Sequence, residues 1–249
     1  LSSGVTKIYS NPYAFAALKD DGSVITWGSS DSAGNSGAAA GGLSSGVTQI
    51  YSTWFAFAAV KSDGSVVTWG LADRGGDSSA VSDDLSSGVT KIYSNPYAFA
   101  ALKDDGSVVT WGMADEGGDS SAVSDYLSSG VTHIHYNNGS FAALKNDGSV
   151  VTWGNPLEGG DKQVWSQNGG VWESLADVSD DLSSGVTQIY SNISYGTFAA
   201  LKIDGSVVTW GRSSYGGDTS AVSDSLSSGV AQIYPNKGSF AALKTDGSV

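Results

Sequence analysis

One segment of about 42 residues recurs along this 249-residue chain, and it constrains the fold more than any other feature. Leu-Ser-Ser-Gly-Val opens each copy, and Asp-Gly-Ser-Val follows about 20 residues later. A period of this length indicates one supersecondary unit that buries its apolar face only against neighbouring copies. We therefore expect a single repeat domain over residues 1–249. Its units span residues 1–42, 43–84, 85–126, 127–181, 182–225 and a partial 226–249.

The third copy shows how each unit is expected to fold. Residues 89–94 and 98–103 are rich in β-branched, aromatic and apolar side chains, which indicates two strands. The Asp-Asp-Gly run at 104–106 predicts a tight turn, because Asp and Gly tolerate hairpin backbone angles. Residues 107–112 then form a third strand, and residues 121–124 predict a short fourth. No long stretch repeats at 3.6 residues, so the chain is predicted to be all-β.

The second and third strands are apolar on both alternating faces, which is typical of strands covered on both sides. Four-stranded blades packed around an axis would supply that cover. We predict a β-propeller with six or seven blades when complete, and an open β-repeat array as the alternative. A β-solenoid is the less favoured arrangement. Its rungs are usually shorter than this repeat, and hairpin turns suit blades better than coils. The repeated structural positions are Trp27, Trp69, Trp111, Trp153 and Trp210 in the third strands, and Gly22, Gly64, Gly106, Gly148 and Gly205 in the turns.

The run at 101–112, Ala-Leu-Lys-Asp-Asp-Gly-Ser-Val-Val-Thr-Trp-Gly, resembles the hallmark of the regulator-of-chromosome-condensation repeat family. The resemblance covers essentially the whole chain and implies a β-propeller, usually seven-bladed. The short period is also similar to the secreted β-lactamase-inhibitor branch of that family. The family's common His before the Ala-Leu strand is missing, and Gly-Gly-Asp replaces its Gly-Gln-Leu-Gly turn. The resemblance therefore implies a fold, and it carries over no nucleotide-exchange or inhibitor surface.

The sixth copy stops at Val249, before a Val-Thr-Trp-Gly strand. We expect either a segment outside this sequence to complete the last blade, or an open ring with an exposed edge. An exposed edge would be an association site, because its backbone groups are unpaired.

Composition excludes several classes of function. The formal net charge is −13, from 25 acidic and 12 basic residues, which argues against nucleic-acid binding. The absence of cysteine excludes disulfides, thiolate chemistry and Cys-ligated zinc. No apolar run reaches the length of a membrane-spanning helix, so no membrane span is expected. An extracellular or cell-surface location is slightly favoured.

No set of residues indicates catalysis, a metal site or a cofactor. His133 and His135 share a strand face, but the sequence marks no third metal ligand beside them. Asp77, Asp119 and their equivalents follow Gly-Gly, and we interpret them as caps of their own turns, because calcium requires a denser set of oxygen ligands. We therefore predict a protein that is not an enzyme.

The fourth copy departs most from the repeat, since its connection after Trp153 is about 13 residues longer. Val-Trp pairs flank the Asn-Gly-Gly run at 168–170, which predicts an extra β-hairpin that carries Trp165 and Trp172. Tryptophan is enriched in binding hot spots. The hairpin is therefore a candidate contact for a protein partner or a carbohydrate, and the alternative is that both rings fold back onto the blade.

Two shorter departures lie between the first and second strands. Trp54 and Phe55 stand there in the second copy, and Tyr195 lies in a two-residue insertion in the fifth. With Tyr13 and Tyr97 they predict an aromatic rim, with ordinary packing as the alternative. We predict a non-enzymatic protein-binding or scaffolding β-propeller that binds a protein partner or self-associates. The alternatives are a structural repeat of a larger extracellular assembly and a secreted enzyme inhibitor.

Overall fold

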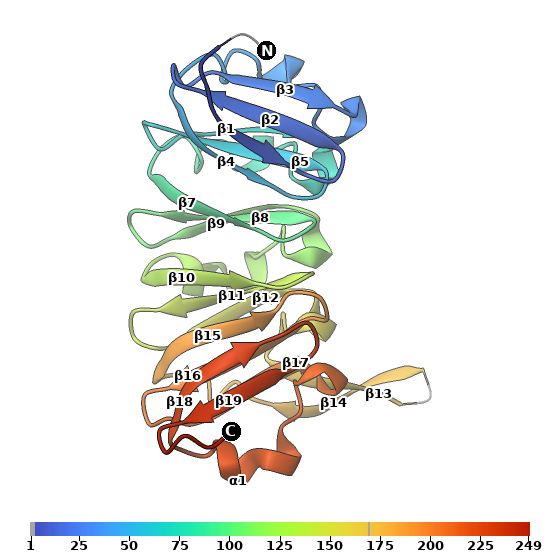
Figure 1. Ribbon diagram of the computed structural model, residues 1–249, viewed down its shortest axis with the longest axis vertical. Helices are drawn as coiled ribbons and strands as arrows, with labels where there is room; N and C mark the ends of the chain where they lie inside the picture. Colours follow the sequence, from blue (N-terminus) through green and yellow to red (C-terminus); the bar gives the residue numbers. More distant parts are fainter. Residues whose placement is uncertain (1–2, 169) are drawn as a thin grey trace. The chain divides into compact units, whose positions relative to one another are not determined.

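The computed structural model describes residues 3–168 and 170–249 and consists almost entirely of antiparallel β-sheets joined by short turns (Figure 1). The chain divides into two compact units, Leu1–Asp119 and Ser120–Val249, and each is described by itself. The predicted all-β class is confirmed. None of the helical segments among the described residues could span a membrane.

Unit 1 holds three sheets of three strands each. Its elements are β1 (Val5–Ser10), β2 (Ala14–Lys19), β3 (Val24–Gly28), η1 (Ser30–Ser32), η2 (Gly37–Ala39), β4 (Val47–Ser52), β5 (Ala56–Lys61), β6 (Val66–Gly70), η3 (Ala72–Arg74), η4 (Ser79–Val81), β7 (Val89–Ser94), β8 (Ala98–Lys103), β9 (Val108–Gly112) and η5 (Ala114–Glu116), where η marks a 3-10 turn.

Unit 2 holds a three-stranded, a five-stranded and a two-stranded sheet among its described residues. Its elements are η6 (Ser121–Leu127), β10 (Val131–Tyr136), β11 (Ser140–Lys145), β12 (Val150–Gly154), η7 (Pro156–Glu158), β13 (Gln163–Asn168), β14 (Val171–Asp177), β15 (Val186–Asn192), β16 (Thr197–Lys202), β17 (Val207–Arg212), η8 (Ser213–Tyr215), η9 (Ser220–Val222), α1 (Ser223–Leu226), β18 (Val230–Pro235) and β19 (Phe240–Lys244).

The Asp-Gly-Ser turn sets the register of each hairpin. In the third copy the Asp105 carboxylate accepts the backbone N–H of Ser107 at 2.8 Å, and Gly106 has φ of +78°, which favours glycine. The turn aligns Phe99 with Trp111 across β8 and β9, and their rings stack at 5.1 Å. In the first copy, hydrogen bonds from the hydroxyl and the backbone N–H of Ser23 lower the pKa of Asp21 to about 2.

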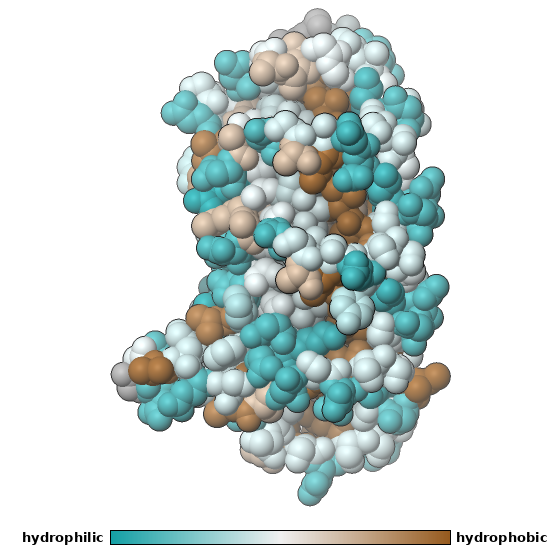
Figure 2. Space-filling view, turned by 180° about the vertical axis from the view of Figure 1, so that it is seen from behind, coloured by the Kyte–Doolittle hydropathy of each residue, from teal (hydrophilic) through white to brown (hydrophobic). Residues whose placement is uncertain are grey.

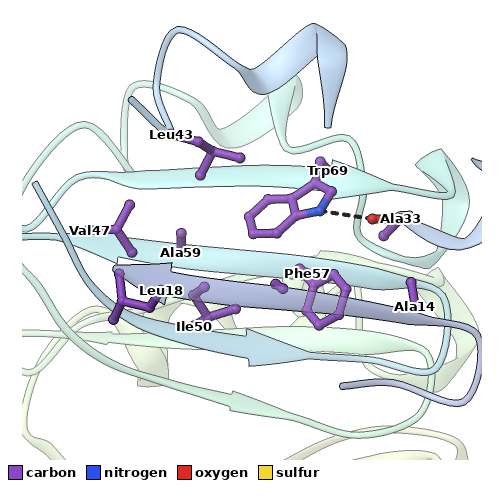
Figure 3. Close-up of a cluster of buried hydrophobic side chains, with 10 residues drawn as sticks. Ala14, Leu18, Ala33, Leu43, Val47, Ile50, Phe57, Ala59 and Trp69 are labelled. Carbon is purple, nitrogen blue, oxygen red and sulfur yellow. Dashed lines mark hydrogen bonds between the residues drawn. The ribbon is translucent and has the colours of Figure 1, made fainter. Parts of the chain in front are cut away.

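Successive sheets of a unit pack face to face. In unit 1, alanines of β5 such as Ala58 are fully buried against Ile92 and Phe99 of the next copy. Alanine brings the two sheets close, while the larger side chains fill the space between them. Figure 3 shows the equivalent cluster between the first and second copies, where Phe57 and Trp69 belong to the core.

Three of the buried tryptophans also link their sheet to the preceding copy of the same unit. The indole Nε1 of Trp69 donates to the carbonyl of Ala33 at 3.1 Å (Figure 3). Trp111 donates to Gly75 at 3.1 Å, and Trp210 donates to Gly159 at 3.0 Å. These bonds satisfy a buried donor, and they explain why this position of the third strand is tryptophan rather than phenylalanine.

The predicted fourth strand is wrong. Residues 121–124 lie in η6, and the equivalent segments of the second and fifth copies form η4 and η9. The Asp77 carboxylate accepts the backbone N–H of Ser79 at 2.9 Å, and Val81 N–H bonds to the Ser78 carbonyl at 3.1 Å. These local bonds close a helical turn, and the side chain of Val81 packs against the next copy without a strand partner.

Candidate binding surfaces

The connector between the first and second strands is built in a similar way in successive copies. In the third copy, the Asn95 Oδ1 atom accepts the N–H groups of Tyr97 and Ala98, both at 2.8 Å. The Asn95 Nδ2 group donates to the carbonyl of Glu116 at 2.7 Å. Asn11 and Thr53 make the equivalent bonds in the first two copies. Connector and 3-10 turn are therefore fixed to one rim of each sheet.

Unit 1 carries aromatic side chains on this rim, from three successive copies. The rings of Tyr13 and Phe55 stack at 5.3 Å, and those of Trp54 and Tyr97 meet at 5.6 Å. The Arg74 guanidinium lies over the Tyr97 ring at 5.5 Å. We call these five residues the aromatic rim. The rings pack on one another, while Tyr13 and Trp54 stay exposed.

The structure thus brings the sequence candidates Trp54 and Phe55 together with Tyr13 and Tyr97. Sequence reasoning missed Arg74. A signal for Arg74 was present in the repeat. The second copy reads Ala-Asp-Arg at 72–74, whereas the third copy has Ala-Asp-Glu at the equivalent positions, so a basic residue replaces an acidic one.

The predicted hairpin in the fourth copy forms β13 and β14, which project from unit 2 (Figure 1). Asn168 pairs with Val171 across its end. At its base, β13 pairs in parallel with β17 through Val164–Gly211 and Trp165–Arg212. An insertion of the fourth copy therefore extends the sheet of the fifth copy to five strands.

The two tryptophans of the hairpin are half-buried rather than fully displayed. The Trp165 Nε1 group donates to the Asp161 carboxylate at 3.1 Å. The Arg212 guanidinium lies over the Trp172 ring at 5.6 Å. Burial raises the pKa of Asp161, although the bond from Trp165 opposes that rise. Since both rings are committed to intramolecular contacts, the structure gives no support for carbohydrate stacking on them.

The hairpin instead exposes two aliphatic side chains, Val171 at 61% and Leu175 at 53%. Leu175 is the extra residue of a β-bulge, because Val164 pairs with Ala176 and Trp165 pairs with Ser174. A groove of about 570 Å³ lies beside it, with Val164 and Leu175 on one side and Val207 of β17 among the other lining residues. Figure 2 shows the hairpin projecting with brown apolar atoms among teal hydrophilic ones.

A buried ion pair ties β17 to the turn before the hairpin. The Arg212 Nη2 atom bonds to the Glu158 carboxylate at 2.8 Å, and the Glu158 side chain is only 6% exposed. The Asn138 amide donates to the second carboxylate oxygen at 3.3 Å. Little in the sequence indicates this network, because Arg212 follows the Thr-Trp-Gly run at a position where the other copies have Ser, Leu, Met or Asn.

Tyr195 contacts residues other than the two hairpin tryptophans. Its ring stacks on Tyr215 at 4.0 Å with a 4° interplanar angle, and Lys237 lies over it at 5.9 Å. It is thus part of a local cluster, as the packing alternative supposes. Gly196, the next residue, has φ of +71° and faces Glu158 so closely that a Cβ would meet it at 2.5 Å.

The recurrent Gly-Gly-Asp aspartates cap their turns, as the sequence predicts. Asp77 and Asp218 each accept the N–H of the second following residue at 2.9 Å. His133 and His135 lie on β10. Within residues 3–168 and 170–249, no group of three or more His, Cys, Asp or Glu side chains could hold a metal ion.

No protein-family model and no curated protein matches the chain. Solved structures with a similar arrangement include human WBSCR16, with 16% identity and a TM-score of 0.45, over 96% of this chain and 66% of that one. Prp20p from Saccharomyces cerevisiae shares 14% identity with a TM-score of 0.46, over 97% and 63% of the two chains. The computationally designed Ika8 protein shares 14% identity with a TM-score of 0.40, over 98% and 69%.

Prp20 is the yeast RCC1 protein, and its structure has been described together with its binding to Gsp1p and histones. This chain spans about two thirds of the length of the three proteins. No inhibitor of β-lactamase is among them.

Proposed function

We propose that this protein is a non-enzymatic protein-binding module and that the β13–β14 hairpin contacts its partner. The observation that carries the proposal is the exposed pair Val171 and Leu175 on the one long insertion in the repeat. Apolar side chains on a projecting element become buried only when a partner covers them.

The hairpin is anchored to the sheet of the fifth copy, as a preorganised binding element requires. The parallel pairing with β17 and the ion pair of Arg212 with Glu158 hold its root. The contacts of Trp165 with Asp161 and of Trp172 with Arg212 order its larger side chains before binding. Less conformational entropy is then lost on association. The groove beside Leu175 could receive an apolar side chain of the partner.

The test distinguishes a loss of partner binding from a loss of protein stability. A Val171→Ser, Leu175→Ser variant should bind an identified partner about tenfold or more weakly, because two exposed apolar contacts are removed. Its melting temperature should stay close to that of the wild type. Partners are isolated by affinity capture on the immobilised protein, identified by mass spectrometry, and measured individually by calorimetry.

The matched control is Ile203→Ser, which removes an 82% exposed side chain of the same unit that does not line the groove beside Leu175. Trp165→Ala and Trp172→Ala should also weaken binding, with some loss of stability because both rings are half-buried. An identified partner that binds the Val171, Leu175 variant as tightly as the wild type would show that the hairpin is not the contact.

The alternative of a structural repeat in a larger assembly has its own support. Ile8 on β1 is 55% exposed, whereas its equivalents Ile50 and Ile92 are 2% and 1% exposed. Phe15 on β2 is 44% exposed, whereas Phe57 is fully buried. The face of the first sheet therefore carries the same residue types that the inner sheets bury against a neighbouring copy. Such a face suits another sheet of the same repeat, from a further copy or a second molecule.

A further inference from the structure

We propose that the aromatic rim of unit 1 binds an extended peptide segment that carries arginine side chains. The rim consists of Tyr13, Trp54, Phe55, Tyr97 and Arg74. It lies in unit 1, whereas the hairpin lies in unit 2, so this proposal does not depend on the function proposed for the hairpin.

The rim offers aromatic surface that is both exposed and ordered. Tyr13 is 50% exposed and Trp54 is 44% exposed, although each contacts a neighbouring ring. The backbone N–H of Trp54 donates to the Pro96 carbonyl of the next copy at 3.0 Å, which holds its connector in place. A ring supported in this way can accept a planar cation without first losing its own rotational freedom.

Carboxylates stand on the same rim. Asp31 of η1 and Asp73 of η3 occupy equivalent positions in the first two copies, and both are exposed. The residue after each aspartate is hydrogen-bonded to the connector. The Asn11 side chain donates to the Ser32 carbonyl, and the Thr53 side chain donates to the Arg74 carbonyl. This arrangement places acidic groups beside the aromatic connectors.

The rim already shows the contact that we infer for a ligand. Arg74 lies over Tyr97, with its Nε atom 3.9 Å from the Asp73 carboxylate. In the first copy Ser32 stands at the position of Arg74. Among the described residues, no cation lies over the Tyr13–Phe55 pair. A guanidinium from another chain could take the equivalent position there.

Arginine fits this surface better than other cationic or aromatic-binding groups. Its planar guanidinium can stack on a ring and pair with a carboxylate at the same time, whereas the lysine ammonium is compact and more strongly hydrated. The carboxylates and the net charge of −13 oppose phosphate-bearing ligands. An arginine-bearing peptide satisfies both the aromatic and the acidic components of the rim.

The test uses the full chain and a fluorescein-labelled peptide, Gly-Arg-Gly-Arg-Gly-Arg-Gly, in anisotropy titrations at low and physiological salt. The arginine peptide should bind about threefold or more tightly than the same peptide with lysine. A Tyr13→Ala, Trp54→Ala variant should weaken it about 5- to 20-fold, since an exposed cation–π contact contributes a factor of about 2 to 5. Asp31→Asn, which removes the first-copy carboxylate equivalent to Asp73, should weaken it about twofold, and less at higher salt.

The controls keep charge and exposed aromatic area matched. Tyr126→Ala removes a 64% exposed ring in unit 2, and Asp84→Asn removes an exposed charge on the opposite rim of unit 1. Neither should change the affinity. Trp54→Phe should retain most of the binding, and circular dichroism checks that each variant folds. Equal binding of the arginine and lysine peptides, or wild-type affinity in the Tyr13, Trp54 variant, would overturn the proposal.

Discussion

A buried tryptophan of the repeat contacts both its own sheet and the preceding copy. Its ring stacks on the phenylalanine of its own sheet, as Trp111 does on Phe99, and its Nε1 group bonds to a carbonyl of the preceding copy. Trp27 lies in the first copy, where its ring is only half-buried. We therefore expect Trp111 to contribute more to the stability of the fold than Trp27 does.

Trp111→Phe should lower the free energy of unfolding by about 1 to 3 kcal/mol, because the Gly75 carbonyl would stay buried without its donor. Urea denaturation followed by circular dichroism measures the change. Trp27→Phe is the matched control and should cost clearly less. Equal losses in the two variants would mean that ring volume, rather than the hydrogen bond, sets the cost.

The hairpin shows how an inserted strand is joined to the sheet of another copy. Among the described residues, the ladder between β13 and β17 consists of two pairs, and Arg212 belongs to one of them. Arg212 also bonds to the buried Glu158 and lies over Trp172. Arg212 therefore contributes to the attachment of the hairpin in three ways, beside the backbone pairing of β13 with β17.

Arg212→Ala should destabilise the protein by about 3 kcal/mol, since it leaves the Glu158 carboxylate buried without its cation. Thermal unfolding measures the loss, and a changed tryptophan emission reports the uncovered Trp172 ring. Adding Glu158→Gln to Arg212→Ala should restore part of the stability, because a neutral amide costs less to bury than a charge. No restoration in the double variant would contradict the role given to the ion pair.

At the scale of the whole molecule, the exposed face of the first sheet bears on assembly. Its apolar residues match those that inner copies bury, and a molecule that presents such a face tends to associate. The net charge of −13 opposes unspecific association at neutral pH. Association through this face should therefore be specific and should strengthen as salt screens the charge.

Ile8→Lys should abolish concentration-dependent association of the full chain, because it places a charge where a second sheet would pack. Light scattering coupled to size-exclusion chromatography measures the mass at several protein and salt concentrations. Ile203→Lys changes an exposed isoleucine of unit 2 and should leave the association unchanged. A wild-type protein that stays monomeric at every concentration and salt level would contradict the assembly alternative.

Local pattern was sufficient for most of the sheets. The strands predicted at 89–94 and 98–103 have those bounds, because β-branched and apolar residues end at Asn95 and at the Asp-Gly turn. The extra hairpin around 168–170 was predicted for the same reason. The segment at 121–124 failed, because its Ser-Ala-Val pattern suits a strand, whereas hydrogen bonds between near neighbours close it into a 3-10 turn.

The sequence by itself determined the repeat, its hairpins and the aromatic composition of the connectors, since each depends on residues close together in the chain. Only the tertiary structure decided how the sheets are joined and which side chains meet. The parallel pairing of β13 with β17, the bond of Glu158 with Arg212 and the Arg74–Tyr97 contact all join different copies. Such contacts depend on the stacking of sheets, and no local pattern records which distant residues the stacking brings together.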